Sequence, residues 1–78
     1  MPATELQQRR TAERGLLTGR EGEILRILAT GASAPEIATQ LHLSPATVKT
    51  HLHNLYGKLG VSDRAAAVAE GMRRGLIS

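Results

Sequence analysis

After residue 15, hydrophobic residues recur three and four positions apart, the spacing of helices that bury one face. The first such segment opens with Thr18-Gly19-Arg20-Glu21. In this capping box the Thr18 hydroxyl accepts from the Glu21 amide, and the Glu21 side chain accepts from the Thr18 amide. We therefore expect a helix from there to about Gly31, with Leu17 packed onto its start. Its expected buried side is Ile24, Leu25, Ile27 and Leu28.

Two further helices follow with a very short connection between them. Ser33-Ala34-Pro35-Glu36 repeats the capping pattern, and the helix it opens runs to about His42. Ser44-Pro45 places a cap before a proline in the first turn, so the next helix begins within about three residues. Such a connection forces a steep crossing, which predicts a helix-turn-helix over residues 36–55. The expected buried residues of the shorter helix are Ile37, Ala38 and Leu41.

The helix that opens at Ser44 has two faces of different character and is expected to end at Gly60. One face is an apolar stripe, and the opposite face begins small and becomes basic and hydrogen-bonding. A face of the second kind suits the major groove of DNA. The apolar stripe is Val48, Leu52, Leu55 and Leu59, and the polar face is Ala46, Lys49, Thr50 and His53.

A fourth helix is expected after Ser62 as its cap, with Asp63 in the first turn and Gly75 beyond its end. A stripe of this kind is ordinarily part of the core, but its small residues leave room for a second copy of the same helix, which favours a two-fold dimer. The stripe consists of Ala65, Val68, Ala69 and Met72.

Composition supports one small all-α domain. The chain has 78 residues, no cysteine, no Phe or Trp, and Tyr56 as its single aromatic residue. Aliphatic side chains must therefore build the core, which favours interlocked helices. Residues 1–15 lack an apolar stripe and are expected to form a flexible arm or linker ahead of a domain at 16–78. The apolar runs are too short to span a membrane, so we expect a cytoplasmic protein.

The distribution of charge says more than its sum. The net charge of +3 is mild, but residues 37–62 contain no carboxylate. The helix-turn-helix is therefore the part of the chain that repels phosphate least. His51 and His53 do not suggest a metal site, because residues two apart on a helix point about 200° apart. We expect no cofactor, no metal and no small-molecule ligand.

A series of short motifs resembles the LuxR/FixJ-type DNA-binding domain, the output module of many bacterial response regulators and quorum-sensing regulators. The resemblance covers Leu17 to Ile77 and keeps the family's order and spacing. The series comprises Leu17-Thr18-Gly19-Arg20-Glu21, Gly31, Glu36-Ile37-Ala38, Leu43-Ser44, Thr47-Val48-Lys49-Thr50-His51, Lys58-Leu59-Gly60-Val61, Arg64 and Gly75-Leu76-Ile77.

The resemblance implies a four-helix domain whose third helix enters the major groove and whose fourth helix pairs two subunits. It places base contacts at Lys49, Thr50 and His53. Candidate contacts to the DNA backbone are Ser44, Thr47, His51, Asn54 and Lys58. The chain departs from the family at Ala34-Pro35, where many members carry Asn-Lys, and at Gly57, often a longer residue.

Several of these residues have a second interpretation. Thr47 fits a phosphate contact and a role in the cap equally well. Lys58 and Arg64 can each reach phosphate, although an ion pair of Arg64 with Glu21 or Glu23 is slightly favoured. His51 suits the edge of the helix interface as well as a phosphate, and Tyr56 is expected at the rim of the core.

The leading prediction is sequence-specific binding of double-stranded DNA in transcription regulation, as a dimer. RNA polymerase is a candidate further partner. The alternative is a protein-interaction module of the transcription machinery whose DNA contact is incidental. An enzyme finds almost no support, because the chain has no cysteine, no phosphate loop and no acid and base paired on one face.

Overall fold

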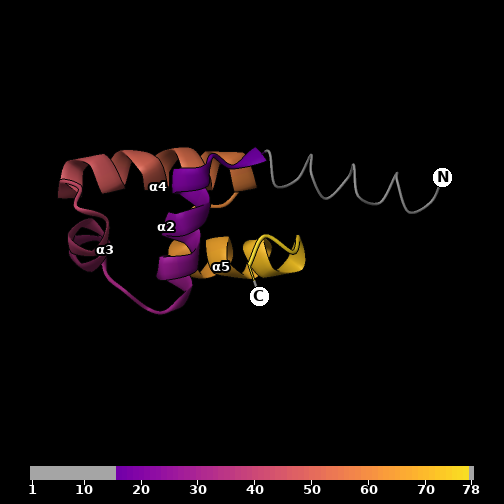
Figure 1. Ribbon diagram of the computed structural model, residues 1–78. Coiled ribbons are helices and arrows are strands. Elements are labelled where there is room, and N and C mark those ends of the chain that lie inside the picture. The colour runs from indigo at the N-terminus through magenta and orange to yellow at the C-terminus, as the bar shows by residue number, and fades with distance from the viewer. Residues whose placement is uncertain (1–15, 78) are drawn as a thin grey trace.

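The computed structural model describes residues 16–77, and this part of the chain folds into four helices without a strand. The helices are α2 (Gly19–Ala29), α3 (Ala34–Leu41), α4 (Pro45–Leu59) and α5 (Arg64–Arg73). Figure 1 shows α2 crossing between α4 and α5, with α3 beside the first turns of α4. The expected all-α four-helix architecture is confirmed. The arm expected at residues 1–15 lies outside the described residues.

Capping side chains fix the starts of the first two helices as the sequence predicts. The Thr18 hydroxyl accepts from the Glu21 amide at 3.1 Å, and Glu21 accepts from the Thr18 amide at 2.9 Å. Ser33 and Glu36 repeat the arrangement at 3.2 and 2.9 Å. Each cap satisfies amides that the helix itself cannot pair, a contribution of about 1 kcal/mol.

Left-handed residues end the two helices of the helix-turn-helix. His42 ends α3 at φ 56°, and Leu43 donates its amide to the Ala38 carbonyl at 2.9 Å. Gly60 ends α4 at φ 70°, as expected. Glycine adopts this conformation without cost, whereas His42 carries a Cβ that disfavours it. The tight break between α3 and α4 is therefore held by the packing of the two helices.

The start of α5 differs from the prediction by one residue. Asp63, and not Ser62, is the N-cap, and its carboxylate accepts from the Ala66 amide at 2.8 Å. The expectation that Asp63 lies in the first turn was therefore wrong. A carboxylate is a stronger acceptor than a hydroxyl and carries a charge that the helix dipole favours, so the later residue prevails.

The core lies where α2 meets the other three helices. Ile24, Leu25, Ile37, Val48 and Leu55 are its largest fully buried side chains. Leu17 is also buried, which confirms its packing against the domain. The other expected core positions Ile27, Leu41 and Leu52 are only half-buried and pack against the outside of this core.

Candidate nucleic-acid interface

Helix α4 begins without negative charge. Ser44 is the N-cap, and its hydroxyl accepts from the Thr47 amide at 3.1 Å. The Ser44 and Thr47 hydroxyls also lie 2.8 Å apart in a hydrogen bond, so Thr47 supports the cap. One of the two hydroxyl protons makes that bond, and the other remains available to an outside acceptor. Among the four described helices, only α4 has no carboxylate at its cap or in its first turn. Its positive end therefore does not repel phosphate.

The two faces of α4 are separated as the sequence predicts. Val48, Leu55 and Leu59 are buried against the other helices, and Leu52 is half-buried. All four residues of the polar face, Ala46, Lys49, Thr50 and His53, are exposed. The Thr50 hydroxyl donates to the Ala46 carbonyl at 3.1 Å, which leaves its oxygen able to accept. Within residues 16–77, no hydrogen bond or ion pair engages the side chain of Lys49 or of His53.

An open hollow of about 570 Å³ lies beside this face, between α4 and the start of α2. His51 and His53 both border it, although they leave the helix in different directions, because the hollow follows the curved surface of α4. His51 is half-buried at the edge of the helix interface, and Asn54 is exposed. The hollow is lined by Thr18, Glu21, His51, His53, Asn54, Gly57 and Lys58.

Glu21 is the buried charge of the described chain and lies at the floor of this region. The residue is 3% exposed, and its carboxylate accepts from the Lys58 ammonium at 2.7 Å and from the Thr18 amide at 2.9 Å. Burial raises the pKa of Glu21, but the hydrogen bonds from Lys58 and Thr18 and the Lys58 charge outweigh it, so the pKa is lowered. The ion pair therefore keeps this carboxylate ionised. Lys58, expected to contact DNA, is thus engaged inside the domain.

Arg64 has a structural role with partners other than those expected. Its guanidinium donates to the Leu28 carbonyl at 2.9 Å and to the Ala32 carbonyl at 2.6 Å. The predicted ion pair with Glu21 or Glu23 was therefore wrong. Arg64 instead adds a side-chain donor to carbonyls at the end of α2 and in the turn after it, where the Leu28 carbonyl also accepts from the Gly31 amide at 3.1 Å.

The small-residue stripe of α5 lies on the surface. Ala65 and Ala69 are exposed, Val68 is half-buried, and Met72 is 50% exposed. The helix turns Ala67 and Gly71 to the core instead. The residues expected at a dimer contact are therefore accessible from outside the domain.

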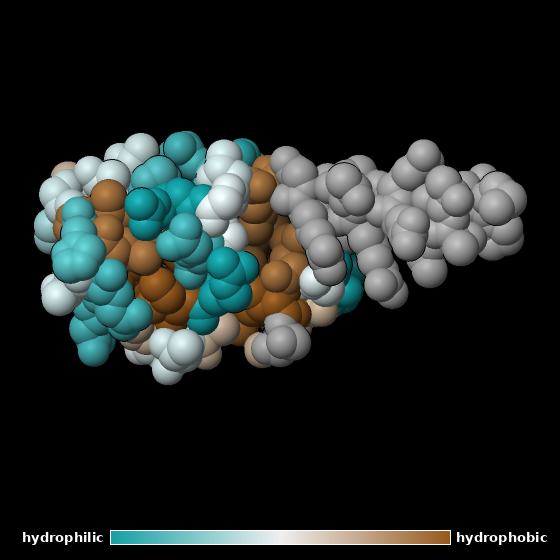
Figure 2. Space-filling model, viewed as in Figure 1, coloured by the Kyte–Doolittle hydropathy of each residue, from teal (hydrophilic) through white to brown (hydrophobic). Residues whose placement is uncertain are grey.

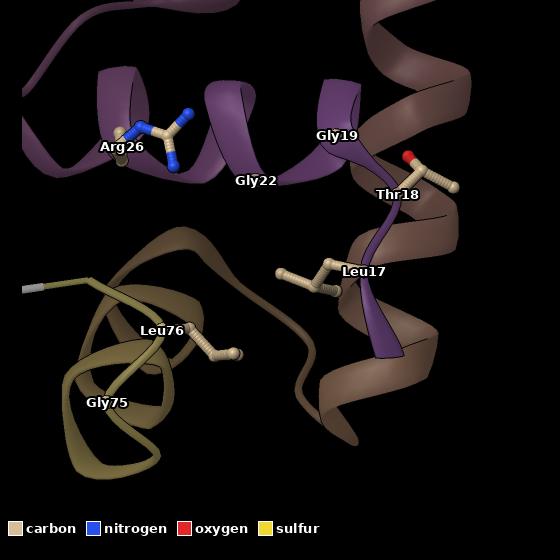
Figure 3. A pocket seen from close by; sticks show the side chains of 7 residues that line it. All are labelled: Leu17, Thr18, Gly19, Gly22, Arg26, Gly75 and Leu76. Atoms are coloured by element: carbon tan, nitrogen blue, oxygen red, sulfur yellow. The ribbon is translucent and has the colours of Figure 1, made fainter. Parts of the chain in front are cut away.

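A second hollow, of about 510 Å³, lies between α2 and the C-terminal turn. Figure 3 shows Leu17 and Leu76 pointing into the same space, with Arg26 above them on α2. Arg26 is the one titratable side chain in its lining, so the hollow holds no acid–base pair. On the face shown in Figure 2, hydrophilic side chains follow α2 and apolar ones gather in the recesses beside it.

The arrangement of a capped helix, tight break and exposed second helix agrees with the comparison against known families. Residues 15–70 match the family model described as bacterial regulatory proteins, luxR family. The chain belongs to the luxR family. The domain is therefore a LuxR-type helix-turn-helix that binds DNA in transcription regulation, as the sequence motifs indicated. No helix within residues 16–77 has the length and hydrophobicity to cross a membrane.

Relatives of this LuxR-type domain are regulators of similar kind. It is 53% identical over 75 residues to the probable transcriptional regulatory protein NarL of Mycobacterium tuberculosis, which covers 96% of the chain and 35% of the relative. It is 52% identical over 59 residues to the CsgBAC operon transcriptional regulatory protein of Escherichia coli, an alignment that covers 76% of this chain and 27% of the relative. The chain therefore spans about a third or less of these curated relatives.

Solved structures show the same fold. The transcription factor GerE superposes with a TM-score of 0.76 and 46% identity, covering 81% of this chain and 94% of GerE. The response regulator ChrA of a heme-sensing two-component system superposes with a TM-score of 0.77 and 48% identity, covering 78% of this chain and 30% of ChrA. Both likenesses combine sequence identity with a shared fold.

Sequence reasoning missed the partners of Glu21 and Arg64. Lys58 lies 37 positions from Glu21, and Arg64 lies 36 and 32 positions from its two carbonyl partners. The capping box accounts for Glu21 locally and gives no sign of its burial. The burial of Glu21 follows from the way another helix covers the start of α2. Only the packed structure shows this, so the sequence carries no signal for it.

Proposed function

We propose that this domain binds double-stranded DNA sequence-specifically by placing α4 in the major groove. The observation that carries the proposal is the exposed face of α4, on which Lys49, Thr50 and His53 have no competing ion-pair partner in the described chain. A lysine at this position donates to guanine O6 or N7, while Thr50 and His53 supply shorter hydrogen-bonding groups to neighbouring base edges.

Contacts to the DNA backbone are proposed along one side of that face. The Ser44–Thr47 hydroxyl pair retains one proton for a phosphate oxygen beside the uncharged start of α4. His51 and Asn54 follow Thr47 at helical spacing along the same side of α4, border the hollow, and offer ring and amide N–H groups to phosphate oxygens. These contacts fix the register of the helix without reading sequence.

We further propose that two copies associate through α5. The face formed by Ala65, Ala69 and Met72 is exposed and apolar, with Arg73 at its edge, so a second copy can pack against it. A two-fold dimer requires a DNA site with two-fold symmetry and a half-site spacing near one helical turn or a multiple of it. RNA polymerase remains a candidate partner of the assembled regulator.

The test begins with selection of bound sequences from random duplexes, which yields the preferred site and shows whether it is symmetric. Affinity for that site and for random DNA is then measured for the wild type and for Lys49→Ala. We expect the substitution to weaken specific binding by about 1–3 kcal/mol and to relax the preference at one base pair.

Arg26→Ala is the matched control, because it also removes one exposed positive charge, but from α2 beside the second hollow. It is expected to leave base preference unchanged. Equal losses on specific and random DNA from Lys49→Ala would contradict base reading by that residue. A wild-type domain that binds no duplex in dilute buffer would favour the protein-interaction alternative.

A further inference from the structure

The ion pair between Glu21 and Lys58 joins a buried group to an accessible one. The Glu21 side chain is 4% exposed, whereas the Lys58 side chain is 35% exposed and borders the hollow beside α4. A buried carboxylate is strongly disfavoured once its partner is removed. A phosphate that drew Lys58 away would leave Glu21 buried with only the Thr18 amide as donor. When Glu21 and a solvent-exposed phosphate compete for Lys58, the ion pair with Glu21 is therefore favoured.

The pair lies where the DNA backbone is proposed to pass. His53, a proposed base contact, and His51 and Asn54, proposed backbone contacts, line the same hollow as Lys58. Glu21 is the only carboxylate in that lining. With both partners charged, the pair contributes no net charge to this part of the surface.

We propose that Glu21 is a positioning residue that sets the charge α4 presents to DNA. It holds Lys58 in a closed ion pair, so that Lys58 supplies no net phosphate contact in the wild-type domain. This inference rests on the proposed function and replaces the simple backbone contact expected of Lys58. Its consequence is unusual: removing the negative charge of Glu21 strengthens binding to DNA.

Glu21→Gln tests the inference because glutamine keeps the length of the side chain and a carbonyl acceptor for Thr18. The variant leaves Lys58 as an uncompensated cation beside the duplex. We expect tighter binding at low salt and a steeper salt dependence. One added phosphate contact per subunit makes affinity fall about 3.5-fold further than in the wild type between about 50 and 200 mM salt.

Two matched variants separate this effect from a general gain of positive charge. Glu23→Gln removes the same formal charge from the same helix, but the Glu23 side chain is 45% exposed and pairs with Arg20 at 3.5 Å. Its salt dependence is expected to stay that of the wild type. Glu21→Gln combined with Lys58→Met removes both charges of the pair, and it too is expected to keep the wild-type salt dependence. Circular dichroism establishes that each variant is folded.

The outcomes distinguish this inference from the proposed function. A wild-type domain that binds no duplex overturns both. If the wild type binds and Glu21→Gln has an unchanged salt slope, only the inference is overturned. A double variant whose slope is lower by about one unit shows that Lys58 leaves Glu21 for a phosphate, which also overturns it. Should Glu21→Gln fail to fold, the slope of the double variant decides the question alone.

Discussion

Two helix-interior glycines make opposite predictions for stability when each is replaced with alanine. Gly71 in α5 is buried, and a Cβ there would lie 2.9 Å from Leu25 Cδ2 and 3.3 Å from Ile77 Cγ1. Gly57 in α4 is exposed, and a Cβ there would meet nothing within 4 Å. Neither residue has a positive φ, so alanine fits both backbones. The surroundings alone decide the sign of each effect.

The magnitudes follow from two terms. Alanine stabilises a helix interior by about 1 kcal/mol relative to glycine, and this gain applies at both sites. At Gly71 the new methyl group must also displace Leu25, which is fully buried, and overpacking of this kind costs about 1–3 kcal/mol. A separation of 2.9 Å is shorter than ordinary carbon contacts, which favours the upper part of that range. We therefore expect Gly71→Ala to lose about 1–2 kcal/mol and Gly57→Ala to gain about 1 kcal/mol.

Urea unfolding followed by circular dichroism measures both free energies in the absence of DNA. For a domain of this size, 1 kcal/mol corresponds to about 4–8 °C in Tm, so thermal scans provide a second readout. Equal slopes against urea in all three proteins are needed to attribute the shifts to stability. A Gly71→Ala protein as stable as Gly57→Ala would refute the argument, because the contact between α5 and Leu25 would then have room for a methyl group.

Two further predictions concern charged side chains. Arg64→Met keeps the apolar stem of the arginine but removes the guanidinium from the Ala32 carbonyl, and it leaves the Leu28 carbonyl with only backbone donors such as the Gly31 amide at 3.1 Å. We therefore expect a loss of about 1–3 kcal/mol in urea unfolding. A loss below about 0.5 kcal/mol would show that water replaces the guanidinium at these carbonyls. Hydrogen bonds from two arginines, one of them Arg74 at 2.9 Å, lower the pKa of Glu70 to about 2. The resulting stabilisation is complete above the ordinary glutamate pKa and is lost as pH falls toward 2. The difference in unfolding free energy between the wild type and Glu70→Gln should therefore shrink over this pH interval. A difference that stays constant with pH would contradict the prediction.

Local signals in the sequence were sufficient for most of the helix boundaries. Thr18 with Glu21 and Ser33 with Glu36 satisfy their own amides within one turn, so their geometry does not depend on the rest of the fold. The same holds for Gly60, whose positive φ ends α4. The exposed face of α4 was also predictable, because four apolar residues at helical spacing leave only one direction for the polar ones.

Contacts between distant parts of the chain were not predictable in the same way. Glu21 looks like an ordinary capping residue until α4 brings Lys58 to within 2.7 Å of it. Arg64 suggests an ion pair with an acidic residue of α2, yet it binds one carbonyl at the end of α2 and one in the turn after it. Hydrophobic periodicity assigns faces to helices but does not tell which ends of two helices meet.

Helix α5 shows why periodicity fails where side chains are small. Ala65, Ala66, Ala67 and Ala69 differ little in the free energy gained by burial, so the sequence does not distinguish an inner from an outer face. The inner face is instead set by how closely the helix can approach its neighbours. Gly71 lets α5 come near Leu25 and Ile77, and Ala67, which lies one turn earlier on the same face, is buried with it. The opposite side of the helix then carries Met72, half of whose surface remains in water. The same close approach that packs α5 onto α2 thus leaves an apolar face outward, and that exposure is what the proposed dimer contact would remove.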